Sequence, residues 1–339
     1  MRAISAVLLL AALAARAQQD SLEKGIAEFH RGEYAAAQAS LEKAADSPQR
    51  RAFLALARAA GGHCDAARTD LAQQFADTPD SELRRLTGLA LSQCELAQGH
   101  YDEAFPVVAR LKTLYPGDAD VLYQTARLHM KAWNEALFEM FQKVPSSYRV
   151  NQISAEIFEI QGRYGEAAAE YRKAIEKNAA ALDLHFRLGR ALLLQSHSPE
   201  NLALARREFE AELSLNPGDA VAEYQIGQIL LAGQDPAAAV KRFERAAGLD
   251  PGFPEALQAV AKARMDAKQY DDAIALLEKV VRLQPKNESA HYSLMMAYRN
   301  AGRTAEAAGQ QAALDKLRQA PEGEFTDFLK RLGDKAPQR

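Results

Sequence analysis

A 34-residue repeat is the feature that most constrains this chain. The segment AAAVKRFERAAGLDP ends at Pro251, and DDAIALLEKVVRLQP ends at Pro285, 34 residues later. The apolar positions coincide as well, because Ala239 aligns with Ala273 and Phe243 aligns with Leu277. Within each segment these positions recur after four and then three residues, which places them on one face of a helix. A helix and its terminal proline, repeated at a fixed interval, predict an array of similar structural units.

Each unit is expected to consist of two amphipathic helices. In AVAEYQIGQILLAGQDPAAAVKRFERAAGLDP, Gly227 follows Ile226 on the first helix, and Ala239 and Ala246 flank Phe243 on the second. Small residues let the partner backbone approach closely, and the bulky residue fills the space beside them. Two such helices cannot bury their apolar faces alone, so neighbouring units must stack to complete the core.

These units resemble tetratricopeptide repeats, which have the same period and the same pattern of small and large residues. The turn between the family's helices recurs as GEYAAA from Gly32, GHYDEA from Gly99, GRYGEA from Gly162 and KQYDDA from Lys268. The resemblance implies an all-α fold, a right-handed α-solenoid of stacked antiparallel helix pairs. About nine units are expected over residues 18–320, at 18–49, 50–82, 83–118, 119–147, 148–180, 181–219, 220–253, 254–287 and 288–320.

Two of these units depart from the pattern. The fourth is shortened and irregular around 130–150: Trp133 replaces the turn tyrosine in KAWNEA, and VPSSYR interrupts the chain before the next helix. We expect a bend or a break between two sub-arrays there. Trp133 is interpreted as an inter-helix packing residue, with a binding hot spot as the alternative. The sixth unit has about four extra residues around QSHSPEN, which predict a longer turn between its helices.

The two ends of the chain have patterns of their own. Residues 1–17 combine a basic start, an apolar run of 13 residues and a small-x-small site at Ala15–Ala17, which predicts a cleaved secretory signal. A retained anchor and a hydrophobic first helix are the alternatives. Residues 321–339 predict a C-terminal capping helix, at 323–333, and a tail. The apolar stripe of that helix would cover the last repeat, or else dock a partner.

Composition and motifs exclude several classes of function. The net charge is −3, and removal of Arg2 and Arg16 with the signal makes it −5, so the basic excess of a nucleic-acid or anionic-membrane binder is absent. No stretch after the signal is apolar enough to span a membrane. The sequence has no metal, phosphate-binding or nucleophile motif, and we expect neither enzymatic activity nor a cofactor. His185 and His291 occupy a position of the first helix where the family commonly places a packing side chain.

The only two cysteines are Cys64 and Cys94. In the repeat register they lie on neighbouring antiparallel helices, offset by roughly one helical turn, or about 5 Å. An exported chain enters an oxidising compartment, where a bridge between them could form. The alternative is a pair of buried free cysteines, which pack well in helical cores.

The resemblance also implies a binding surface, because certain positions of each first helix commonly face the concave groove in this family. In units six to nine these positions hold Phe186, Arg187, Arg190, Tyr224, Gln225, Gln228, Gln258, Lys262, Tyr292, Met296, Arg299 and Asn300. Phe186 and Tyr224 stand where the clamp of chaperone-binding members needs Lys or Asn, so a receptor for chaperone tails is not expected. The expectation is an exported tetratricopeptide scaffold in the periplasm or outside the cell, which binds a peptide segment or partner protein in its groove. The alternative is an accessory subunit of an envelope enzyme complex, for instance in polysaccharide export or protein maturation.

Overall fold

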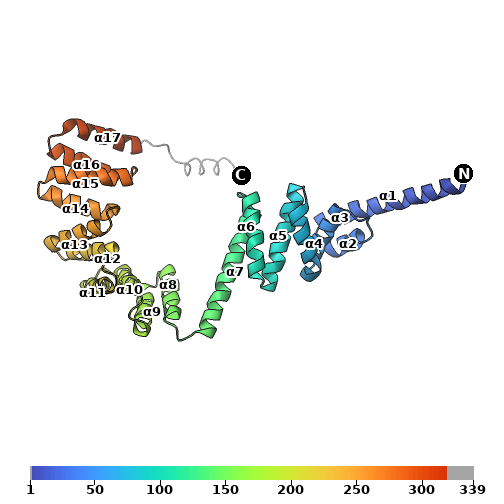
Figure 1. The fold of residues 1–339 in the computed structure, drawn as a ribbon, viewed down its shortest axis with the longest axis horizontal. Coiled ribbons are helices and arrows are strands. Elements are labelled where there is room, and N and C mark those ends of the chain that lie inside the picture. The colour runs from blue at the N-terminus through green and yellow to red at the C-terminus, as the bar shows by residue number, and fades with distance from the viewer. Residues whose placement is uncertain (1, 319–339) are drawn as a thin grey trace, which may run out of the picture. The chain divides into compact units, whose positions relative to one another are not determined.

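The computed structural model describes the backbone of residues 2–318 and the side chains of residues 16–318. This part of the chain is all-α, with 17 helices and no strand, and it divides into two compact units at Lys143 and Val144 (Figure 1). The first unit contains α1 (Arg2–His30), α2 (Tyr34–Leu41), α3 (Pro48–Ala60), α4 (Cys64–Asp77), α5 (Ser81–Gln98), α6 (Tyr101–Leu114) and α7 (Ala119–Lys143). The second contains α8 (Tyr148–Ile160), α9 (Tyr164–Lys177), α10 (Leu184–Gln195), α11 (Pro199–Leu215), α12 (Ala220–Ala232), α13 (Pro236–Leu249), α14 (Pro254–Asp266), α15 (Tyr270–Leu283), α16 (Glu288–Asn300) and α17 (Thr304–Arg318).

All of these helices except α7 form pairs of chain neighbours. Three pairs precede α7, from α1 with α2 to α5 with α6, and five follow it, from α8 with α9 to α16 with α17. A short turn joins the helices of each pair, and seven of the eight turns contain one residue in the left-handed region. These residues are Gly32, Gly62, Gly99, Gly162, Gln234, Lys268 and Gly302, with φ between 60° and 85°. Glycine is the usual choice because it has no Cβ to clash in this conformation. Lys268 and Gln234 show that longer side chains also occupy this position in the chain.

The core repeats the small-and-large arrangement that the sequence predicts. Gly227 of α12 faces Phe243 of α13, and Gly189 of α10 faces Phe209 of α11. Phe243 is 3% exposed and Phe209 is fully buried. The first and second helices of a pair can therefore approach closely, and a large ring closes the gap between them. The tetratricopeptide-type solenoid expected from the sequence is the observed fold class.

The fourth expected unit is not a helix pair. Its two halves form the single 25-residue helix α7, which Figure 1 shows as one uninterrupted helix. Trp133 is an exposed residue of this helix and does not pack between two helices. The boundary between the two compact units lies directly after α7, within residues 130–150, where the sequence predicts an irregular unit.

The expected longer turn in the sixth unit is wrong. Only residues 196–198 separate α10 from α11, a connection as short as that between α12 and α13. The extra residues lengthen α11, which has 17 residues where α9, α13 and α15 have 14. Ser198 caps this helix by accepting a hydrogen bond from the Asn201 backbone N–H, and Pro199 occupies its first turn. A serine cap followed by proline starts a helix at this point, so the extra residues join α11 and do not lengthen the turn.

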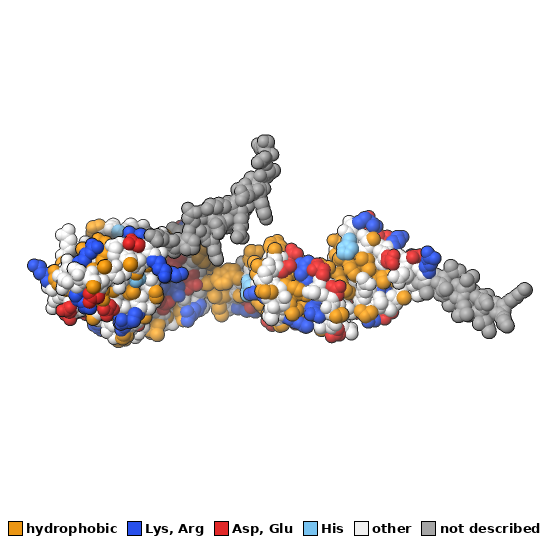
Figure 2. All heavy atoms as spheres, turned by 90° about the horizontal axis from the view of Figure 1, so that it is seen from above, with side chains coloured by type: hydrophobic (Ala, Val, Ile, Leu, Met, Phe, Trp, Pro, Cys, Tyr) orange, Lys and Arg blue, Asp and Glu red, His pale blue; other side chains and the backbone are white. Residues whose placement is uncertain are grey.

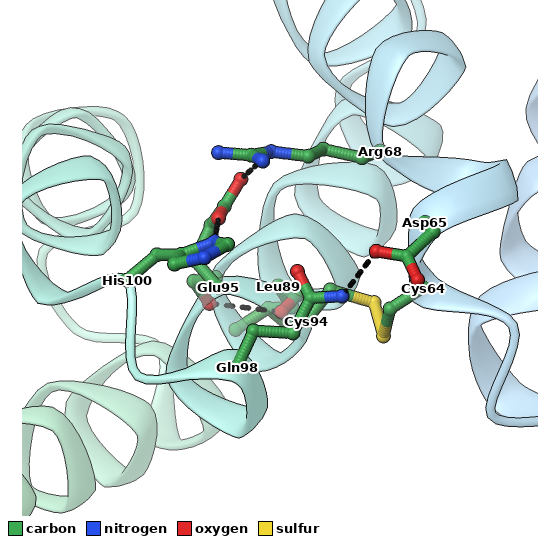
Figure 3. The surroundings of a disulfide bond; sticks show 9 residues. Cys64, Asp65, Arg68, Leu89, Cys94, Glu95, Gln98 and His100 are labelled. Carbon is green, nitrogen blue, oxygen red and sulfur yellow. Dashed lines mark hydrogen bonds and ion pairs between the residues drawn. A yellow bond between two sulfur atoms is a disulfide. The ribbon is translucent and has the colours of Figure 1, made fainter.

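A disulfide joins Cys64, the first residue of α4, to Cys94 in α5 (Figure 3). The two Cα atoms are 5.3 Å apart, within the range that a disulfide spans without backbone movement. Polar contacts between the same two helices lie around it: Gln98 donates to Asp65 over 2.5 Å, and Arg68 donates to Glu95 over 2.7 Å. The α4–α5 junction is therefore held by a covalent bond as well as by packing.

The two ends complete the description. Helix α1 passes without interruption through the expected cleavage site before Gln18, and its later residues Leu22, Ile26 and Phe29 pack against the core of the first repeats. The expected capping helix at 323–333 lies outside the described residues. Among the described helices, none has both the length and the apolarity that a membrane crossing requires.

Candidate binding groove

A cavity of about 730 Å³ opens in the second compact unit, lined by residues of α12 to α16. Six of the residues expected to face a groove line it: Tyr224 and Gln228 from α12, Gln258 and Lys262 from α14, and Tyr292 and Met296 from α16. The second helices of the pairs contribute mainly apolar side chains, such as Val240 and Leu277. The cavity is thus lined on one side by three consecutive first helices.

These six residues form two rows across the helices. Tyr224, Gln258 and Tyr292 are each 34 residues apart, and so are Gln228, Lys262 and Met296. On each helix the two members are four residues apart and therefore lie on the same face. Stacking three equivalent helices brings side chains far apart in sequence into one surface. The repeat period by itself thus predicts which residues align, provided that the helices stack in register.

The polar groups of the groove are partly engaged with one another. Gln228 donates a hydrogen bond to the Tyr224 hydroxyl over 2.7 Å, and Gln258 donates to Ser289 over 3.2 Å. The Tyr224 ring lies 5.1 Å from the Phe253 ring, centroid to centroid, and is half-buried. Burial raises the pKa of Tyr224, and the hydrogen bond from Gln228 partly offsets this effect. Tyr224 and Gln228 are therefore held in place before any ligand binds.

Two other side chains of the groove are free to meet a ligand. Tyr292 is 52% exposed, and Lys262 is exposed and makes no ion pair with any residue between 16 and 318. The lining also contains Glu255 and Asp266, so its charges are mixed. Sequence reasoning missed these carboxylates and the two serines Ser289 and Ser293. Glu255 and Ser289 are 34 residues apart, so the repeat period could have identified them together.

The other six expected residues lie outside this cavity. Arg187 pairs with Asp183 over 2.5 Å and with Glu156 of α8 over 3.3 Å. Arg190 pairs with Glu159 of α8 over 2.6 Å. Phe186 packs against Phe209 with ring centroids 5.4 Å apart. Among the rest, Gln225 is half-buried, and Arg299 and Asn300 are exposed at the end of α16. The two arginines and Phe186 thus have structural contacts within the repeats.

Phe186 and its helix owe their position to a residue of α11 that the sequence reading did not single out. Glu212 is 1% exposed, and its carboxylate accepts hydrogen bonds from the backbone N–H groups of Asp183 and Phe186, over 2.9 and 3.3 Å. These N–H groups belong to the start of α10, where the Asp183 side chain makes no capping bond. A carboxylate at a helix N-terminus satisfies otherwise unpaired donors and suits the helix dipole. The sequence shows only a glutamate near the end of α11, and its burial is visible only in the structure.

The two histidines expected to pack within the repeats, His185 and His291, both have structural contacts there. His291 is 6% exposed, with its ring nitrogens 2.7 Å from Gln310 Oε1 and 3.0 Å from the Pro285 carbonyl oxygen. His185 contacts Glu208 over 2.7 Å. Across the described residues, no group of three or more His, Cys, Asp or Glu side chains is arranged to hold a metal ion.

Comparison with known proteins gives matches to helical-repeat structures at low identity. The model of the bacterial transcriptional activator domain matches residues 185–320, which span α10 to α17. No relative was found among curated proteins.

Three solved structures illustrate the matches. MamA from Desulfovibrio magneticus RS-1 is 18% identical, with a TM-score of 0.46 over 52% of this chain and 98% of that one. Another MamA structure is 20% identical, with a TM-score of 0.45 over 52% of this chain and 95% of that one. YrrB, described as a tetratricopeptide protein with an unusual peptide-binding site, is 18% identical, with a TM-score of 0.45 over 55% of this chain and 94% of that one.

Three features of the chain itself define its fold without reference to these matches. They are the 34-residue period, the left-handed turns and the packing of glycine against phenylalanine. They recur in pair after pair of the described helices. The described part of the chain therefore has the fold of a helical-repeat array of the tetratricopeptide type.

Proposed function

We propose that this chain is an exported, non-catalytic scaffold that binds an extended peptide segment of a partner protein in the groove of α12, α14 and α16. The observation that carries the proposal is the pair of rows formed by Tyr224, Gln258 and Tyr292 and by Gln228, Lys262 and Met296. A cavity of about 730 Å³ is of the size that small ligands and short peptide segments fill. A row of side chains crossing three helices suits an elongated ligand better than a compact one.

The chemistry of the groove indicates how a peptide would be held. The amides of Gln228 and Gln258 can donate to and accept from a peptide backbone. Tyr292 offers a large exposed ring with a hydroxyl, the type of side chain that often dominates binding energy. Lys262 favours a carboxylate on the ligand. Binding would therefore combine contacts to the Tyr292 ring, to the two glutamine amides and to the Lys262 ammonium group.

Export is the second part of the proposal. The basic start, the apolar run and the small-x-small site of residues 1–17 support it. A disulfide between the only two cysteines fits an oxidising compartment, where such bonds form and persist. The partner would then be another exported protein.

The experiment compares charge reversal inside and outside the groove. Proteins captured by the purified chain from an envelope extract are identified, and the affinity of the captured partner is measured for each variant. Lys262→Glu and Tyr292→Ala should weaken binding, whereas Lys241→Glu should not, because Lys241 is an exposed lysine of α13 outside the cavity lining. Helical circular dichroism should be the same for all three.

Two results would contradict the proposal that the partner binds in the groove. One is unchanged affinity in both groove variants. The other is loss of capture when residues 319–339 are removed while the groove variants bind normally, which would assign binding to the C-terminal segment.

A further inference from the structure

The last described residue lies at the rim of the groove. Arg318 ends α17, and its guanidinium pairs with Glu288, the first residue of α16, over 3.2 Å. The next residue of α16, Ser289, lines the groove and accepts a hydrogen bond from Gln258 of α14. The C-terminal segment, residues 319–339, therefore begins beside the end of the groove at which α14 and α16 start.

A few residues are enough to bring this segment into the groove. Packed helices lie about 8–10 Å apart, and four extended residues span about 13 Å, so residues 319–322 reach from α17 across the start of α16. The sequence predicts a helix at 323–333, and eleven helical residues are about 16 Å long. Glu255 and Asp266 are the first and last residues of α14 that line the groove, and they are also eleven residues apart. The predicted helix thus has the length of the groove.

The last helix pair exposes no other large apolar side chain that this segment could cover. The predicted helix carries one apolar stripe, formed by Phe325, Phe328, Leu329 and Leu332. Among the described side chains of α16 and α17, Tyr292 is the one large hydrophobic side chain that is exposed, and it lines the groove. In Figure 2, α17 faces the viewer at the left end, and hydrophobic side chains there are scattered among polar and charged ones. The stripe therefore finds its apolar counterpart in the groove.

The groove itself offers a partly open apolar surface. Leu231 of α12 is 42% exposed and Tyr292 of α16 is 52% exposed, and both line the cavity. Val240 of α13 and Met296 of α16 are half-buried beside them. A stripe of phenylalanine and leucine side chains placed here would remove apolar surface of both partners from water, which favours the docked state.

The charges of the groove are complementary to those of the segment. Lys262 and Asp266 follow one another along α14, both are exposed, and neither pairs with any residue between 16 and 318. In the C-terminal segment the acidic residues come first and the basic residues follow: Glu322, Glu324 and Asp327, then Lys330 and Arg331. A segment that enters at the start of α14 passes Glu255 with the uncharged residues 319–321 and meets Lys262 before Asp266. Its carboxylates then lie near the lysine and its basic groups near the aspartate.

We propose that residues 323–333 of this chain occupy the groove of α12, α14 and α16, and that they exclude the peptide segment of a partner until they are displaced. The occupancy is argued from the groove and the C-terminal segment alone, whereas the exclusion rests on the proposed function.

Hydrogen exchange of the full chain without a partner tests the occupancy. If residues 323–333 are docked in about nine molecules of ten, their amides should exchange about tenfold more slowly in the natural chain than in Phe325→Glu/Phe328→Glu. Lys262→Glu should also speed the exchange, whereas Lys241→Glu, outside the cavity lining, should not. The slow exchange should be independent of protein concentration, because the segment belongs to the same molecule.

A charge exchange provides the sharpest control. Asp327→Lys alone should speed the exchange of residues 323–333, because it places a lysine near Lys262. The double variant Lys262→Glu/Asp327→Lys should restore slow exchange. A helix that merely covers the last repeat would not respond to residue 262.

Partner binding tests the exclusion separately. In Phe325→Glu/Phe328→Glu the groove is free, and the captured partner should bind about tenfold more tightly if nine natural molecules of ten are closed. Slow exchange in the natural chain together with unchanged partner affinity in this variant would contradict the exclusion and the proposed function, but not the occupancy.

Three results would overturn the occupancy and leave the proposed function standing. They are fast exchange of residues 323–333 in the natural chain, slow exchange that Lys262→Glu does not alter, and slow exchange that appears only at high protein concentration. The last would mean that a second copy of the chain supplies the segment.

Discussion

The ring of Phe243 fills the space that a side chain at position 227 would need. A Cβ added to Gly227 would lie 2.5 Å from Phe243 Cε1, closer than real Cβ contacts allow. The same relationship recurs between Gly189 and Phe209, at 2.9 Å. In each case the glycine belongs to the first helix of a pair and the ring to the second. The glycine is therefore required by packing and not by backbone conformation, because its φ is not positive.

Gly227→Ala should destabilise the fold by about 1–3 kcal/mol, the usual cost of inserting a methyl group into a closely packed core. Urea unfolding followed by circular dichroism measures the effect. Gly248→Ala is the control, because Gly248 also lies in a helix but nothing stands within 4 Å of its added Cβ. That change should raise stability by about 0.5–1 kcal/mol through better helix propensity. Equal unfolding midpoints for the two variants would contradict the packing argument.

Loss of the disulfide should lower stability by about 3–4 kcal/mol in the chain-entropy model, because Cys64 and Cys94 close a loop of 30 residues. The comparison is between the natural chain and Cys64→Ser/Cys94→Ser in urea unfolding without reductant. Thiol titration of the unfolded natural chain should find no free thiol. Two free thiols in material isolated after export would show that the bridge does not form in the cell.

Two buried tyrosines should make stability fall at high pH. Burial raises the pKa of Tyr171 to about 12, and burial followed by the hydrogen bond to Glu278 does the same for Tyr298. Because these folded-state values exceed the ordinary value near 10, the folded chain holds the protons more tightly. The resulting stabilisation is complete below pH 10 and is lost as the pH rises towards 12. Unfolding midpoints measured from pH 9 to 12 should decline more gently in Tyr171→Phe than in the natural chain.

At pH 7 the same two positions should respond differently to phenylalanine. No hydrogen bond of regular geometry reaches the Tyr171 hydroxyl from the described residues, although the Arg187 guanidinium lies close enough to lower its pKa, so Tyr171→Phe should change the stability little. The Tyr298 hydroxyl donates to Glu278 over 2.6 Å, and Tyr298→Phe should cost about 1.5 kcal/mol. Equal effects of the two substitutions on the unfolding midpoint would contradict this assignment.

Processing of the N-terminus should remove residues 1–17. N-terminal sequencing of the exported chain should begin at Gln18 or within a few residues of it. Leu22, Ile26 and Phe29 remain on the processed chain, so the packing of α1 against the first repeats should survive cleavage. The same region of the chain expressed from Gln18 should unfold at the same urea concentration as the exported protein. An intact mass that includes Met1 in exported material would refute the cleavage.

The sequence by itself determined the helix pairs and their period. The signals that define a unit are local, because they involve residues of one unit or of its immediate neighbours. They are the turn residues Gly32, Gly99, Gly162 and Lys268, the buried alanines that follow them, and the glycines that pack against phenylalanine. Local signals of this kind can be read without a tertiary structure because an array repeats the same short-range contacts. For the same reason, the alignment of Tyr224, Gln258 and Tyr292 followed from the period.

The tertiary structure decided which of these side chains are available. Arg187 and Arg190 occupy positions expected to face the groove, yet carboxylates already engage them: Asp183 and Glu156 pair with Arg187, and Glu159 pairs with Arg190. KAWNEA resembles the other turns, yet Lys131 continues α7 as helix. A turn forms only when the two helices that it joins gain enough by packing on each other, and that gain depends on which surfaces the rest of the chain presents. The 34-residue period shows which segments could form helix pairs. Contacts between segments far apart in the sequence determine which of them do.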